Sequence, residues 1–80
     1  MNIQLIHGHF SKADSLDLIT QMIHVKIRYH ENKIKASSNE EDTKMRETKI
    51  KRLQKDLFDL KKLLDSNNDI VSITSQIEIE

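Results

Sequence analysis

The sequence predicts a small, mostly helical α+β domain whose 80 residues follow the order strand, helix, helix, strand. Two long stretches without glycine or proline carry apolar residues at helical spacing, and a shorter strand-like stretch lies near each end of the chain. Because the two helices have similar lengths and a short link, they should pack as a long antiparallel hairpin. The two terminal strands are then expected to pair antiparallel, within a single domain over residues 1–80.

The first strand is predicted over residues 2–7, where Ile3, Leu5 and Ile6 alternate loosely with polar residues. Gly8, the only glycine of the chain, is expected to end this strand. Glycine adopts backbone angles that other residues avoid, and for that reason it often interrupts regular structure.

The first helix is predicted over residues 12–36, with the Ser11 hydroxyl as its N-cap. It carries two apolar stripes, and a helix with two separated apolar faces must cover two surfaces. The first stripe contains Leu16, Ile19, Ile23, Ile27 and Ile34, and the second contains Leu18, Met22, Val25 and Tyr29. The sequence leaves open which of the two stripes faces the second helix.

The second helix is predicted over residues 39–64, and a Ser38-x-x-Glu41 capping box is expected to open it. Its apolar seam steps by three and four residues, which is the a/d pattern of coiled-coil packing. The seam contains Ile50, Leu53, Leu57, Leu60 and Leu64. Phe58 and Leu63 lie beside it and are expected to widen it.

A polar segment over residues 65–69 predicts a turn, and the alternating β-branched residues after it predict a strand over residues 70–79. The alternation places Val71, Ile73, Ile77 and Ile79 on one face of this strand, as in a sheet with one buried face. The strand contains neither lysine nor proline to guard its edge, so it is open to pairing with a second copy.

Small size also favours a partner. An 80-residue chain usually needs a disulfide, a metal ion or oligomerisation to supplement its core, and this one contains no cysteine and no evident metal site. We therefore expect a self-associating protein that forms a homodimer, with another protein partner as an open alternative. The predicted interface residues are Leu18, Met22, Val25, Tyr29, Val71, Ile73, Ile77 and Ile79.

The sequence contains no motif for catalysis or for a cofactor. One glycine is too few for a P-loop or a dinucleotide-binding loop, and no serine lies in a G-x-S-x-G motif. We expect a protein that is not an enzyme, with no catalytic residue and no cofactor.

Histidine side chains can bind metal ions, but the sequence assigns no metal site to them. His7 and His9 are one residue apart and could bind a divalent ion weakly, and this remains open. His30 and Glu31 begin like a zincin motif, but Ile34 replaces the second histidine. We expect His30 to be a hydrogen-bonded histidine of the core or of an interface.

Charge is balanced overall, at thirteen basic and thirteen acidic residues, but it is not evenly distributed. Residues 26–62 hold twelve basic and seven acidic residues, whereas residues 63–80 hold four acidic residues and no basic one. The alternative function is therefore an accessory role in nucleic-acid binding, although few aromatic residues could stack on bases. Its candidate phosphate contacts are Lys44, Lys49, Lys51, Arg52 and Lys55.

The chain shows neither a membrane-spanning apolar segment nor a signal peptide, so a cytoplasmic location is expected. Four segments, IQLIHGHFS, VKIRYHENKI, KIKRLQKDLFDLKKLL and ITSQIEIE, resemble a group of small bacterial proteins that have no assigned activity. The resemblance covers most of the chain and implies the same strand-helix-helix-strand order.

Overall fold

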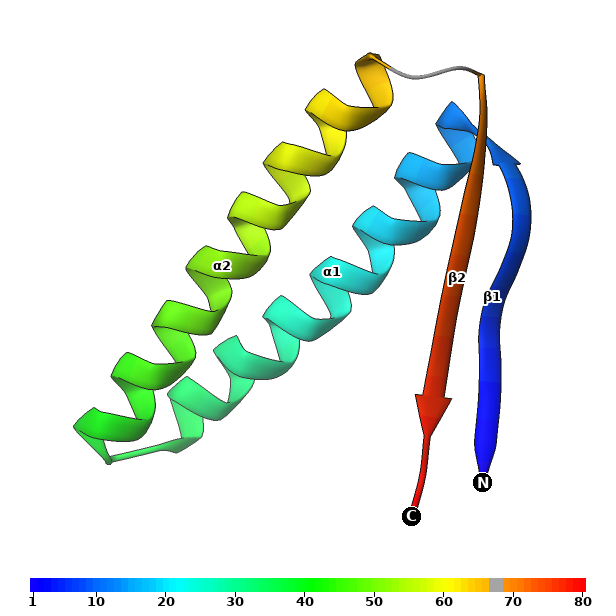
Figure 1. Ribbon diagram of the computed structural model, residues 1–80. Coiled ribbons are helices and arrows are strands. Elements are labelled where there is room, and N and C mark those ends of the chain that lie inside the picture. The colour runs from blue at the N-terminus through cyan, green and yellow to red at the C-terminus, as the bar shows by residue number, and fades with distance from the viewer. Residues whose placement is uncertain (67–68) are drawn as a thin grey trace.

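The computed structural model describes residues 1–66 and 69–80, and it confirms the predicted fold class (Figure 1). The elements are strand β1 (Asn2–Ser11), helix α1 (Lys12–Ala36), helix α2 (Glu40–Asp65) and strand β2 (Ile70–Glu78). The two helices lie side by side as an antiparallel hairpin, and the two strands pair antiparallel as a two-stranded ribbon (Figure 1).

Strand β1 is longer than the sequence predicts, and the expectation that Gly8 ends it is wrong. Gly8 has a φ of +146°, a backbone region that favours glycine. It nevertheless lies within the ladder, opposite Ile73. Glycine therefore lets the strand adopt an unusual angle while remaining paired, and β1 continues to Ser11.

A β-bulge at Leu5 decides which side chains share a face of the ribbon. The pairing register shifts between Gln4 and Ile6, so Leu5 is an extra residue on β1. Ile3 and Ile6 consequently point to the same face, although three positions separate them. This apolar face carries Ile3, Ile6 and Phe10 of β1 and Val71, Ile73 and Ile77 of β2.

Strand β2 ends at Glu78, one residue before the predicted end. Backbone pairing continues for one more step, because the Ile79 amide donates a hydrogen bond of 2.7 Å to the Met1 carbonyl. The turn predicted over residues 65–69 includes residues 67–68, which lie outside the described residues.

Helix α1 has the predicted bounds, 12–36, and the predicted N-cap. The Ser11 hydroxyl accepts a hydrogen bond of 3.1 Å from the Asp14 amide, which would otherwise lack a partner in the first turn. The Asp14 carboxylate also lies where the helix dipole favours negative charge.

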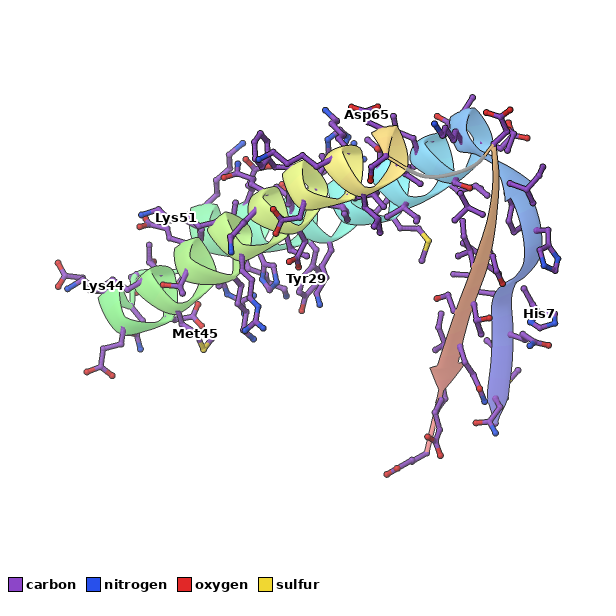
Figure 2. The ribbon with its side chains drawn as sticks, turned by 45° about the horizontal axis from the view of Figure 1, so that its top comes forward. His7, Tyr29, Lys44, Met45, Lys51 and Asp65 are labelled. Carbon is purple, nitrogen blue, oxygen red and sulfur yellow. The ribbon has the colours of Figure 1, made fainter. Side chains whose placement is uncertain are left out.

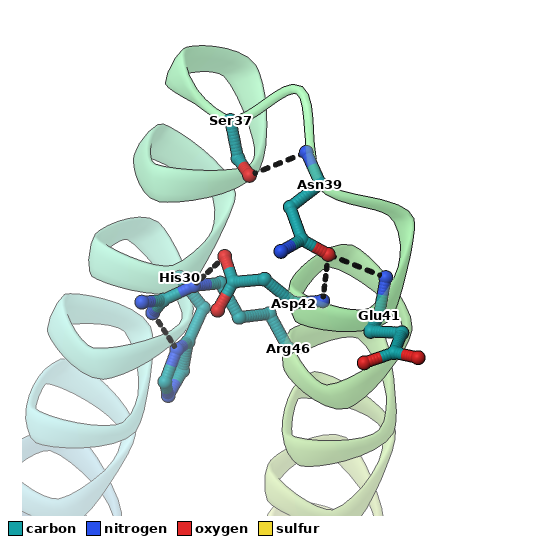
Figure 3. Close-up of polar contacts among 6 residues, drawn as sticks. All are labelled: His30, Ser37, Asn39, Glu41, Asp42 and Arg46. Carbon is teal, nitrogen blue, oxygen red and sulfur yellow. Dashed lines mark hydrogen bonds and ion pairs between the residues drawn. The ribbon is translucent and has the colours of Figure 1, made fainter.

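Helix α2 is capped by Asn39 and not by Ser38 of the predicted capping box (Figure 3). The Asn39 side-chain oxygen accepts hydrogen bonds from the amides of Glu41, at 2.9 Å, and Asp42, at 3.2 Å. The helix starts at Glu40, one residue later than predicted, and the residue directly before its first turn is the one whose side chain reaches these amides.

The two stripes of α1 face different elements. The first stripe faces α2, where Leu16 lies beside Leu64, although Ile19 and Ile23 of this stripe also line a hollow with the ribbon. The second stripe faces the ribbon, where Met22 lies beside Leu5 and Ile6 of β1. The choice that the sequence left open is thus decided by the packing.

Phe58 and Leu63 do not widen the seam of α2, contrary to the prediction. They are 58% and 57% exposed, because α1 is the element that packs against α2 and it covers only the seam. The Lys62 ammonium lies 4.5 Å from the centre of the Phe58 ring, a cation–π contact at the surface.

The core of the molecule is thin. Ile6 and Leu64 are the buried apolar side chains of the described residues, at 9% and 4% exposed. The Cα atoms span 45 × 32 × 13 Å, and their radius of gyration is 15.1 Å. A compact chain of this length has a radius of gyration of about 12 Å. The protein is therefore a flat, open plate in which much of the apolar surface stays uncovered.

Candidate interaction surface

The ribbon and the hairpin form an open V. They meet where β1 runs into α1 and diverge toward the tip of the hairpin and the chain termini (Figure 1). The ribbon packs against the first half of α1, where Leu5 and Ile6 of β1 lie beside Leu18 and Met22. The ribbon reaches as far as Val25, beside Leu5 of β1, and Lys26, beside Ile73 of β2, and from there to the tip of the hairpin the side toward the V is uncovered.

We call this uncovered side the open face. It consists of Val25, Lys26 and Tyr29 of α1 together with Met45, Lys49 and Arg52 of α2. Figure 2 shows Tyr29 and Met45 on the side of the hairpin toward which the ribbon descends, and Lys51 on the other side. Lys26, Lys49 and Arg52 line a groove between the two helices with Leu53 and Asp56.

The open face combines apolar and basic side chains. Val25, Tyr29 and Met45 are 62%, 53% and 48% exposed. Two cations lie near the Tyr29 ring, Lys33 at 5.7 Å and Arg46 at 5.8 Å from its centre. The half-exposed Tyr29 ring thus adds an apolar area with a polar tip to the open face.

A polar cluster links the two helices near the tip of the hairpin (Figure 3). His30 of α1 is 5% exposed, as expected for a hydrogen-bonded histidine of the core. The Arg46 guanidinium of α2 lies 3.1 Å from Nδ1 of His30 and 3.0 Å from the Asp42 carboxylate. An arginine can only donate, so Nδ1 accepts and the neutral ring carries its hydrogen on Nε2.

The environment of His30 disfavours the charged ring. Burial lowers the pKa of His30 below its ordinary value of 6.5, and the positive charges of Arg46, Lys49 and Lys26 lower it further, whereas Asp42 raises it. Nε2 is buried and has no hydrogen-bond partner among the described residues. His30 is consequently a neutral link between the helices.

The eight predicted interface residues fall into two groups. Leu18, Met22, Val71 and Ile73 are half-buried close to where the ribbon and α1 meet. Val25, Tyr29, Ile77 and Ile79 are exposed on the two diverging arms of the V. The structure thus brings the first group together within one copy and leaves the second group uncovered, and their role in an interface stays a prediction.

The five candidate phosphate contacts do not share one surface. Lys49 and Arg52 line the groove of the open face. At 100° per residue, Lys44, Lys51 and Lys55 lie together on the side of α2 that points away from α1. A nucleic acid that contacted all five basic side chains would have to reach two different sides of α2.

His7 and His9 are exposed and lie opposite Thr74 and Ser72, on the face of the ribbon that carries its polar side chains. Within residues 1–66 and 69–80, no group of three or more histidine, aspartate or glutamate side chains is placed to hold a metal ion.

Sequence reasoning missed Arg46 and Met45. Continuing the three-four spacing of the α2 seam backward from Ile50 reaches Arg46, opposite His30, and this is the signal that would have revealed the polar cluster. No comparable signal marks Met45, because its neighbours on the open face come from a different helix.

No family model, curated protein or solved structure matches this chain. Neither helix, over the described residues, has an apolar stretch long enough to span a bilayer. The surface itself is therefore the basis for a functional hypothesis.

Proposed function

We propose that this chain is a small self-associating module that works as a homodimer and binds rather than catalyses. One observation carries the proposal: a single copy exposes more surface than a compact monomer of its mass, including ten large apolar side chains among the described residues. Its accessible surface is 6421 Å². A compact monomer of this mass exposes about 5,000 Å².

The excess area is more than a stable dimer interface buries on each partner. It amounts to about 1,400 Å², and a typical stable interface buries about 800 Å² on each partner. A second copy that covered the open face and the end of the ribbon would restore an ordinary ratio of buried to exposed surface. A small ligand in the shallow grooves would cover far less.

A second copy could also cover the strand edges of the ribbon whose backbone groups are unpaired. Each strand of the ribbon has one unpaired edge, since the sheet contains two strands. Two-stranded ribbons are marginal in water, and a partner that packs against this one supplies what the thin core lacks.

Sedimentation equilibrium at micromolar concentration tests the proposal with two matched variants. Val25→Glu places a charge on the open face, at a side chain 62% exposed. Phe58→Glu places the same charge at a side chain that is 58% exposed. Phe58 lies two helical turns after Lys51 and therefore on the same side of α2 as Lys51, which is the side opposite to the open face. We expect a dimer for the wild type and for Phe58→Glu.

Val25→Glu should raise the dissociation constant by at least about ten-fold, because a charged side chain loses its hydration when an interface buries the apolar surface at this position. Circular dichroism should show that both variants keep their helical content. A wild-type chain that stays monomeric at tens of micromolar, or an equal response of the two variants, would overturn the proposal.

A further inference from the structure

We infer that the acidic end of the ribbon of one copy binds the basic open face of the other. This inference rests on the proposed self-association and specifies which surfaces meet. We call the ribbon end the set Ile3, Ile77, Glu78, Ile79 and Glu80.

The open face holds positive charge that its own chain does not neutralise. Lys26, Lys49 and Arg52 line one groove, and Asp56 is the single acidic residue there. Over the part of the chain that the structure describes, the one ion pair is that of Arg46 with Asp42. Three cations around one groove thus lack a carboxylate within ion-pair distance.

The ribbon end holds the complementary chemistry. Glu78 and Glu80 are exposed, and neither forms an ion pair in the structure as described. Ile77 and Ile79 alternate with them, so they lie on the opposite face of the ribbon end, where they are 41% and 50% exposed. The open face likewise carries exposed apolar side chains, since Val25 and Tyr29 are on the same helix as Lys26.

The two surfaces are on different arms of the V, so they diverge within one copy (Figure 1). Between two copies related by a two-fold axis, each contact occurs twice, because each copy contributes one open face and one ribbon end. Complementary charge then fixes which surfaces pair, while the apolar side chains supply the buried area. A contact of open face with open face would bring six cations together and is disfavoured.

Charge reversal tests this pairing. Glu78→Lys with Glu80→Lys gives a chain whose two surfaces are both basic, and Lys49→Glu with Arg52→Glu gives a chain whose two surfaces are both more acidic. We expect each double variant alone to dimerise at least about ten-fold more weakly than the wild type. A one-to-one mixture should recover a dimer, because both contacts in the mixed pair are again between opposite charges.

The control is Lys51→Glu with Lys55→Glu, which makes the same charge change on the side of α2 away from α1. It should dimerise like the wild type. If a variant does not fold, the salt dependence of the wild-type dimer provides the second measurement, and its dissociation constant should rise with ionic strength because salt screens exposed charges.

The outcomes separate the two proposals. A wild-type dimer that ignores charge reversal and salt would overturn the inference and leave self-association standing. A wild-type monomer would overturn both. A monomer that binds short duplex DNA in a salt-dependent way, and loses this binding with Lys49→Glu and Arg52→Glu, would assign the open face to nucleic acid instead.

Discussion

His30 links the two helices through a single hydrogen bond in which it is the acceptor. Its Nδ1 lies 3.1 Å from the Arg46 guanidinium, and a protonated ring would carry a hydrogen on that nitrogen as well. Protonation would therefore break the contact and place a second positive charge beside Arg46. The residue acts as a neutral acceptor in a region of positive potential.

Stability should consequently fall as the pH drops below the ordinary histidine value. The pKa of His30 is lowered from 6.5 in the folded chain, so between the two values the unfolded chain binds a proton that the folded chain does not. The free energy of unfolding is unaffected by this group at higher pH, decreases as the pH falls through about 6.5, and levels off below the folded-state pKa.

Chemical denaturation at about pH 7.5 and about pH 5 measures this effect, with His30→Gln as the comparison. A glutamine oxygen can accept from Arg46 and does not titrate, so the variant should lose less stability between the two pH values than the wild type does. Equal losses in both chains would show that other groups account for the pH dependence.

Within the helices, local signals specify where each element begins, and the caps are the clearest case. Ser11 caps α1 as expected, but the prediction of Ser38 as the cap of α2 is wrong by one residue. Both types are good N-caps, and adjacent candidates are distinguished only by where the chain leaves the turn. The sequence therefore predicts the presence of helix α2 correctly but places its first residue one position too early.

Asn39→Ala should destabilise the protein by about 1 kcal/mol, because the amides of Glu41 and Asp42 would lose their acceptor. Ser38→Ala is the matched control and should change the free energy of unfolding by no more than about 0.5 kcal/mol. Urea denaturation of both variants checks the assignment. A larger loss for the Ser38 variant would restore the capping box that the sequence predicted.

The ribbon shows where periodicity stops being informative. Alternation predicted the apolar face of β2, which the register confirms for Val71, Ile73 and Ile77. In β1 the bulge at Leu5 and the paired Gly8 break strict alternation, and a sequence pattern of period two does not reveal an extra residue.

For the molecule as a whole, our proposal implies that folding is coupled to dimerisation, because the core of a single copy is small. Two buried apolar side chains among the described residues are few for a chain of 80 residues. A dimer whose monomers are poorly stable unfolds and dissociates together, so its apparent stability depends on protein concentration.

The melting temperature should then rise by roughly 5–10 °C when the protein concentration increases about 100-fold, as mass action predicts for a two-chain transition of this size. Calorimetry or circular dichroism over that range measures the shift. A melting temperature that does not change with concentration would contradict the coupling of folding to dimerisation.

The sequence by itself determined the element order, the extent of both helices to within a residue, the two stripes of α1 and the burial of His30. These features depend on spacing and capping within a few residues, which composition and periodicity record directly. Only the tertiary structure decided which stripe meets the ribbon, where Arg46 and Met45 lie, and how far the two arms of the V diverge. The physical reason is that these arrangements depend on contacts between segments far apart in the chain, and a local pattern carries no information about the angle at which two elements meet.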